Sequence, residues 1–146
     1  MARGYFGIVV ERGKTPANIG TLWRSAHIFG ASFLGIIGAR YRRDPSDTTH
    51  AGLHVPLIHY KDLDDLRHHL PYECTLVGVE FEESATKIRQ YVHPVRAIYL
   101  LGAEDSGLSD ETKQACRHLV VLPGRFCLNV AVAGSLVMFD RVMKDG

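Results

Sequence analysis

The stretch LPGRFCLNVAVAGSL, residues 122–136, begins with polar residues and continues with apolar and small ones, a pattern that an ordinary core helix does not have. Its first half carries the polar residues Arg125, Cys127 and Asn129, whereas every residue from there to Phe139 is apolar, Gly or Ser. A helix that is apolar on all sides is normally buried, by its own domain or by a partner chain. We therefore predict a buried helix from about Leu128 to Met143, preceded by a loop that carries the polar residues.

Apolar runs of strand length precede this stretch along the chain. They are nearly continuous rather than alternating, which is typical of strands covered on both faces. Segments of helical character separate several of them, so the sequence predicts an α/β fold, a parallel sheet with helices on both faces. The predicted strands are 5–10, 33–37, 55–60, 74–79, 97–101 and 119–122, and the predicted helices before the last one are 16–29, 63–70 and about 109–116.

The bulk composition indicates one globular domain over residues 1–146. With 46% hydrophobic and 23% charged residues the chain is not typical of disorder, and no apolar run approaches the ~20 residues that span a bilayer. We expect no membrane segment and no signal peptide. Three cysteines without CxxC spacing favour a reducing compartment, so we expect a cytoplasmic protein.

The charged and metal-binding residue types give a weaker indication. The net charge of +1 does not by itself predict a nucleic-acid partner, although Arg40, Arg42 and Arg43 lie together. That cluster is either a solvated loop or a contact to RNA phosphates. The eight histidines are scattered along the chain, so we expect no metal site.

Two further motifs stand out, NIGTLWR at 18–24 and LLGAEDSGL at 100–108. In the first, Pro16 and Thr15 begin a helix that Gly30 ends. In the second, an apolar strand ends and a Gly-containing loop follows. Ligands of open α/β sheets bind at the carboxyl ends of strands, so this loop is either a ligand contact or a plain strand-to-helix turn. The phosphate-binding and dinucleotide motifs are absent from the sequence.

The three motifs together resemble a known family. Asn-x-Gly-x-x-x-Arg near the N-terminus, Leu-Gly-x-Glu-x-x-Gly-Leu in the last third, and a Pro-containing loop that leads to Leu-Asn-Val resemble the SpoU (TrmH-like) branch of the SPOUT RNA methyltransferases, from about residue 5 to 143. The resemblance implies a C-terminal deep trefoil knot that holds S-adenosylmethionine, and a homodimer through helices near the knot. Because knotted chains are rare, only the resemblance predicts the knot.

The resemblance also implies a reaction, the transfer of a methyl group to a ribose 2′-hydroxyl of RNA. The matching catalytic positions are Asn18, Arg24, Glu104 and Asn129. Arg24 either draws the proton from the hydroxyl or, since a guanidinium stays protonated, grips a phosphate and stabilises the developing alkoxide. We expect tRNA as the substrate, with the anticodon wobble position as a candidate, and rRNA as the second choice.

The cofactor contacts follow from the same resemblance, whereas the basic cluster adds candidate contacts to RNA. Two departures from the family pattern, Cys127 and Ala131 in place of Ser, leave open an alternative, a non-catalytic RNA- or nucleotide-binding module that retains the knot. The expected RNA contacts are Arg24, Arg40, Arg42 and Arg43, and the expected cofactor contacts are Val79, Glu80, Leu101, Gly102, Leu122, Pro123, Cys127 and Leu128.

Overall fold

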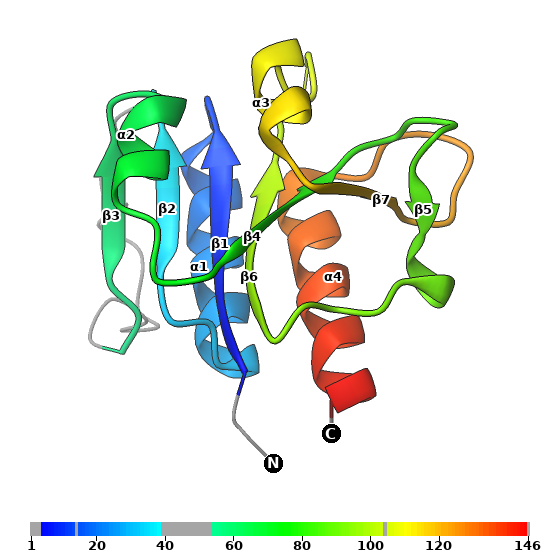
Figure 1. The fold of residues 1–146 in the computed structure, drawn as a ribbon, viewed down its shortest axis with the longest axis horizontal. Coiled ribbons are helices and arrows are strands. Elements are labelled where there is room, and N and C mark those ends of the chain that lie inside the picture. The colour runs from blue at the N-terminus through cyan, green and yellow to red at the C-terminus, as the bar shows by residue number, and fades with distance from the viewer. Residues whose placement is uncertain (1–3, 14, 39–53, 104, 146) are drawn as a thin grey trace.

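The computed structural model of the chain is a three-layer α/β fold built on one parallel sheet (Figure 1). It describes residues 4–13, 15–38, 54–103 and 105–145. The seven strands are ordered β3-β2-β1-β6-β4-β7-β5, and every neighbouring pair is parallel. The strands are β1 (Tyr5–Glu11), β2 (Leu34–Ile37), β3 (Leu57–Tyr60), β4 (Thr75–Val79), β5 (Thr86–Lys87), β6 (Arg96–Leu101) and β7 (His118–Val121), and the helices are α1 (Pro16–Phe29), α2 (Leu63–His68), the 3-10 turn η2 (Ile88–Gln90), α3 (Asp110–Ala115) and α4 (Val130–Asp145).

All six predicted strands and all four predicted helices are present, with their ends shifted by a few residues. The sequence did not predict β5 or η2. Both residues of β5 are exposed, so this edge strand has no apolar run to mark it. The last helix begins at Val130 rather than near Leu128, because Asn129 caps it.

Alternate side chains of the strands enter two separate cores, one on each face of the sheet. On one face, residues such as Ile8 and Leu101 pack with buried side chains of α1 and α4. On the other, residues such as Val9 and Leu100 pack beneath α2 and α3. Figure 1 shows α1 and α4 together on one side of the sheet. Burial on both faces explains why the strands read as continuous apolar runs.

The ends of α1 agree with the sequence in position but not in every contact. Thr15 is the residue before the helix, as predicted, but its side chain makes no capping hydrogen bond. Gly30 ends the helix in the left-handed conformation, with φ of 83°. A residue with a side chain would be strained in that conformation, so glycine suits this position.

Helices α1 and α4 run side by side in the same direction. Ser25 and Ser135 pair their hydroxyl oxygens at 2.7 Å, and Phe29 and Phe139 meet edge to face further along both helices. Gly134 permits this close approach, because a Cβ there would lie 2.5 Å from the Leu22 side chain. The packing leaves the outer face of α4 uncovered, so the prediction of a helix buried on all sides holds for one face only.

A buried guanidinium fixes the last turns of α4 to the chain that leads into β6. Arg141, which is 2% exposed, donates hydrogen bonds to the carbonyl oxygens of Pro94 at 2.7 Å and Val95 at 2.8 Å. It also donates to the Tyr99 hydroxyl oxygen at 3.0 Å and lies over the Phe6 ring. The C-terminal half of α4 is therefore held by specific polar contacts as well as by packing.

The same network continues through His93. Tyr99 Oη lies 2.6 Å from His93 Nδ1, and His93 Nε2 lies 2.7 Å from an Asp140 carboxylate oxygen. If Tyr99 donates to His93 and His93 donates to Asp140, a neutral imidazole satisfies both neighbours. Burial lowers the pKa of His93, although the hydrogen bond that His93 donates to Asp140 opposes the shift. Burial raises the pKa of Tyr99 to about 12.

No helix in the described part of the chain is both long and apolar enough to cross a membrane.

Candidate active site

A cleft of about 330 Å³ lies at the carboxyl ends of three neighbouring strands, β6, β4 and β7. Its walls come from four parts of the chain, namely the segments after these strands and the start of α4. Figure 1 shows the segment 122–129 leaving β7, passing beyond β5 and returning to α4. The described residues that line the cleft are Val79, Glu80, Phe81, Leu101, Gly102, Ala103, Asp105, Ser106, Gly107, Val121, Leu122, Phe126, Cys127, Leu128, Val130 and Ala133.

The loop after β6 closes on itself through two glycines. A Cβ at Gly102 would lie 2.1 Å from the carbonyl carbon of Gly107, a distance that no side chain tolerates. Gly107 has a φ of +68° and donates its backbone N–H to Ala103 at 2.9 Å. Leu108 then enters the core. The two ends of the loop are thus in close contact, which fixes one wall of the cleft.

Two carboxylates fix the end of this loop, because each accepts a hydrogen bond from one of two consecutive backbone N–H groups. Glu80, after β4, accepts from the N–H of Leu108 at 2.7 Å, and Glu11, at the end of β1, accepts from the N–H of Ser109 at 2.7 Å. Glu11 is buried and also accepts from the hydroxyl groups of Ser109 and Thr112. These contacts connect three strands to one loop, so the wall is positioned by the whole edge of the sheet.

The charges on the cleft wall have one sign. Among the described lining residues, the charged side chains are Glu80 and Asp105, and the rest are apolar, glycine, Ser106 or Cys127. An acidic wall with apolar surroundings favours a ligand that combines a positive charge with an apolar body.

The two predicted asparagines meet at one end of the cleft wall. Asn129 accepts hydrogen bonds from the backbone N–H groups of Ala131 at 2.9 Å and Val132 at 3.3 Å, so it caps α4. Its amide nitrogen donates to the Asn18 side-chain oxygen at 3.0 Å. Residues 111 positions apart in the sequence are therefore joined where α1 and α4 begin.

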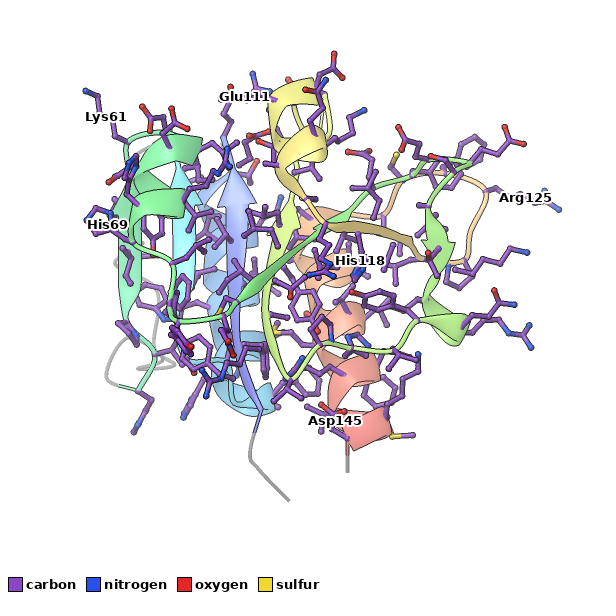
Figure 2. All side chains as sticks on the ribbon, viewed as in Figure 1. Lys61, His69, Glu111, His118, Arg125 and Asp145 are labelled. Carbon is purple, nitrogen blue, oxygen red and sulfur yellow. The ribbon has the colours of Figure 1, made fainter. Side chains whose placement is uncertain are left out.

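The predicted arginines have a different location. Arg24 is on the solvent face of α1 and is not among the residues that line the cleft. Arg125, in the loop before α4, projects from the outer edge of the molecule (Figure 2). Arg40, Arg42, Arg43 and Glu104 lie outside the described residues.

The predicted cofactor contacts come together in the cleft with one exception. Pro123 is exposed and does not line it. Val79, Glu80, Leu101, Gly102, Leu122, Cys127 and Leu128 all do.

The cysteines differ in their surroundings. Cys127 is an exposed thiol on the cleft wall. Cys116 lies at the end of α3, where burial raises its pKa to about 12, and a thiol with that pKa is inert at neutral pH. Within the described residues no group of three or more His, Cys, Asp or Glu side chains could hold a metal ion.

The sequence analysis missed several residues of the site. Glu11 had a recognisable signal, a carboxylate at the end of an otherwise apolar strand. Phe81 and Phe126 line the cleft and are largely exposed, at 48% and 82% of their surface. They lie in loops whose course depends on the tertiary structure, so their part in the cleft had no local signal.

Comparison with known proteins identifies the family. The sequence matches the family model described as the SpoU rRNA Methylase family over residues 5–139. The chain belongs to this family. Membership implies that the C-terminal segment forms the trefoil knot that the family resemblance led us to expect.

Two curated relatives and two solved structures illustrate the likeness. The tRNA (guanosine(18)-2′-O)-methyltransferase TARBP1 of Mus musculus is 26% identical over 140 residues, which cover 89% of this chain and 9% of that protein. The 23S rRNA (uridine(2479)-2′-O)-methyltransferase of Streptomyces viridochromogenes is 24% identical over 155 residues, which cover 96% of this chain and 53% of that protein. The chain therefore spans about half of one curated relative and about a tenth of the other.

The structural neighbours share the fold of the SpoU family. The SpoU methyltransferase AviRb from Streptomyces viridochromogenes, in complex with the cofactor AdoMet, has a TM-score of 0.87 at 23% identity, covering 99% of this chain and 59% of that chain. A structure concerned with 2-OH methylation of C/U34 on tRNA has a TM-score of 0.78 at 20% identity, covering 99% of this chain and 100% of that chain.

Proposed function

We propose that this member of the SpoU family is an S-adenosylmethionine-dependent RNA methyltransferase that modifies a ribose 2′-hydroxyl. The observation that carries the proposal is the cleft, where apolar walls and two acidic side chains meet at the carboxyl ends of three parallel strands. Both curated relatives are named as RNA 2′-O-methyltransferases. The family membership and the cleft support the same reaction.

The residues present fit the cofactor. Leu101, Leu122 and Leu128 supply apolar surface for an adenosyl group, and Gly102 lines the same cleft. Glu80 supplies negative charge on the same wall. When bound, S-adenosylmethionine supplies an electrophilic methyl group on a positively charged sulfur.

The reaction is an in-line displacement at the methyl carbon. The ribose 2′-oxygen forms a new C–O bond, the C–S bond breaks and leaves its electron pair on sulfur, and the hydroxyl proton passes to water. The protein supplies orientation and a site that excludes competing water. The Asn18–Asn129 hydrogen bond fixes the start of α4, and with it the wall formed by Val130 and Ala133.

Arg24 acts on the RNA rather than on the cofactor in this proposal. Arg24 is exposed on the solvent face of α1, so its guanidinium is accessible to RNA. A guanidinium remains protonated at neutral pH, so Arg24 grips a phosphate next to the target ribose and stabilises the alkoxide as it forms.

We infer that tRNA is the substrate. One curated relative is named for tRNA, and the neighbour concerned with C/U34 of tRNA is matched over its whole length. The other curated relative is named for 23S rRNA, so rRNA is the competing substrate.

We also propose that the protein works as a homodimer. The outer face of α4 carries large apolar side chains four and three residues apart, at Val132, Leu136, Phe139 and Met143, each more than 40% exposed. Ile28, on the adjacent α1, is 68% exposed. A contiguous apolar patch on paired helices is typical of an interface, and a second copy of this chain is the partner that family resemblance implies.

Methyl transfer from labelled S-adenosylmethionine to separate tRNA and rRNA pools tests the function. The proposal expects label in tRNA, a large loss with Arg24→Ala, and a loss with Arg24→Lys because lysine keeps the charge but not the two-pronged geometry. Arg67→Lys, in the short helix α2, is the matched control. Full activity in Arg24→Lys would contradict the assigned role of Arg24, and transfer to rRNA alone would contradict the choice of substrate.

A further inference from the structure

We propose that Glu80 makes the cleft distinguish the charged methyl donor from the uncharged product. This inference rests on the proposed function, because it concerns the cofactor of that reaction. S-adenosylmethionine carries a sulfonium, and S-adenosylhomocysteine, which remains after methyl transfer, carries a neutral thioether in its place. A fixed negative charge on the cleft wall interacts with the first and not with the second.

The Glu80 carboxylate is held in place by the backbone. One oxygen accepts from the N–H of Leu108 at 2.7 Å, and the other accepts from the N–H of Phe81 at 3.2 Å. Gly107 leaves room for it, since a Cβ at that position would lie 2.8 Å from Glu80 Oε1. The carboxylate is therefore a fixed feature of the wall rather than a mobile surface charge.

No cation neutralises this carboxylate among the described residues. The ion pairs of the neighbourhood involve other groups, with Lys113 on Glu82 at 3.6 Å and Arg12 near Glu11 at 3.9 Å. Asp105 also lines the cleft. Backbone N–H groups stabilise an anion without cancelling its charge, so Glu80 keeps its negative charge at the wall of the cleft.

Methyl transfer changes the charge of the cofactor but not that of Glu80. Transfer of the methyl group removes the positive charge from the cofactor while Glu80 keeps its negative charge. The electrostatic attraction is lost at the chemical step, which favours exchange of the product for a new donor. Two unit charges about 4 Å apart in a water-like medium attract each other by about 1 kcal/mol, which corresponds to about a fivefold change in affinity.

The test is calorimetric binding of three ligands to the full chain. S-adenosylmethionine and sinefungin carry a positive charge at the relevant position, and S-adenosylhomocysteine does not. Glu80→Gln removes the charge and retains one oxygen that can accept from the Leu108 N–H, while the longer bond from the Phe81 N–H is lost. Glu82→Gln removes a nearby carboxylate that does not line the cleft and is the matched control.

The inference expects a selective effect of Glu80→Gln. The affinities for S-adenosylmethionine and sinefungin fall about fivefold, the affinity for S-adenosylhomocysteine changes less than twofold, and Glu82→Gln changes none of them. An equal loss for all three ligands in Glu80→Gln would mean that Glu80 only shapes the loop, and would overturn the inference while leaving the proposed function intact. Failure of the unsubstituted protein to bind any of the three would contradict the proposed function and the inference together.

Discussion

Replacement of the buried Arg141 by Met removes the donor that holds the end of α4. Met keeps an unbranched apolar stem but has no guanidinium, so the carbonyl oxygens of Pro94 and Val95 lose the donors that now lie at 2.7 and 2.8 Å. The third hydrogen bond that Arg141 donates, to the Tyr99 hydroxyl oxygen, is also lost. Each buried acceptor left unpaired costs about 1–3 kcal/mol, whereas the ion pair to the half-exposed Asp145 adds little.

The expected loss in the free energy of unfolding is therefore about 3–5 kcal/mol, a large part of the 5–15 kcal/mol typical of a domain. Urea unfolding followed by circular dichroism measures it, at one fixed protein concentration because dimerisation would contribute to stability. Arg96→Met is the control, since Arg96 is exposed and makes one longer hydrogen bond, to the Tyr72 carbonyl at 3.2 Å. A difference below about 1 kcal/mol between the two variants would refute the reasoning.

Three other perturbations have defined outcomes. The pKa of His93 is lower in the folded state than its ordinary value, so the unfolded state takes up the proton more readily and stability falls as the pH drops through 6.5. The urea midpoint should therefore depend less on pH between 5.5 and 8 in His93→Gln than in the unsubstituted protein. The same pH dependence of the midpoint in both proteins would contradict this. Gly102→Ala forces a Cβ against Gly107 and should weaken S-adenosylmethionine binding at least tenfold in calorimetry, whereas binding at the original affinity would contradict the closed loop. Leu136→Glu should shift the protein to a monomer in sedimentation velocity, with the exposed Tyr72→Glu as control, and an unchanged dimer would locate the interface elsewhere.

Local signals in the sequence were sufficient for most of the fold. Strands buried on both faces appear as continuous apolar runs, and Pro16 and Gly30 mark the ends of α1. The two-residue strand β5 has no such signal, because pairing with β7 rather than burial of its side chains defines it. The all-apolar helix was predicted correctly in position, but its covered and uncovered faces could be separated only once its packing against α1 was known.

The sequence predicted which segments form the candidate site, but it did not predict the contacts between their side chains. Val79, Leu101 and Leu122 end or follow adjacent strands, so their meeting at one edge follows from the parallel sheet. The bond between Asn18 and Asn129 was not predictable from spacing, because it depends on α1 and α4 beginning at the same level. Glu11 was recognisable as a carboxylate at the end of an apolar strand, but its partners Ser109 and Thr112 are distant in sequence and could not be predicted.

Nucleoside mapping of the methylated RNA tests the central claim most directly. The full chain is incubated with methyl-labelled S-adenosylmethionine and unmodified tRNA, and the RNA is digested to nucleosides and separated. The account predicts that the label appears in a 2′-O-methylated nucleoside. Label on a base atom, or no transfer to any RNA by a protein that binds the cofactor, would contradict it.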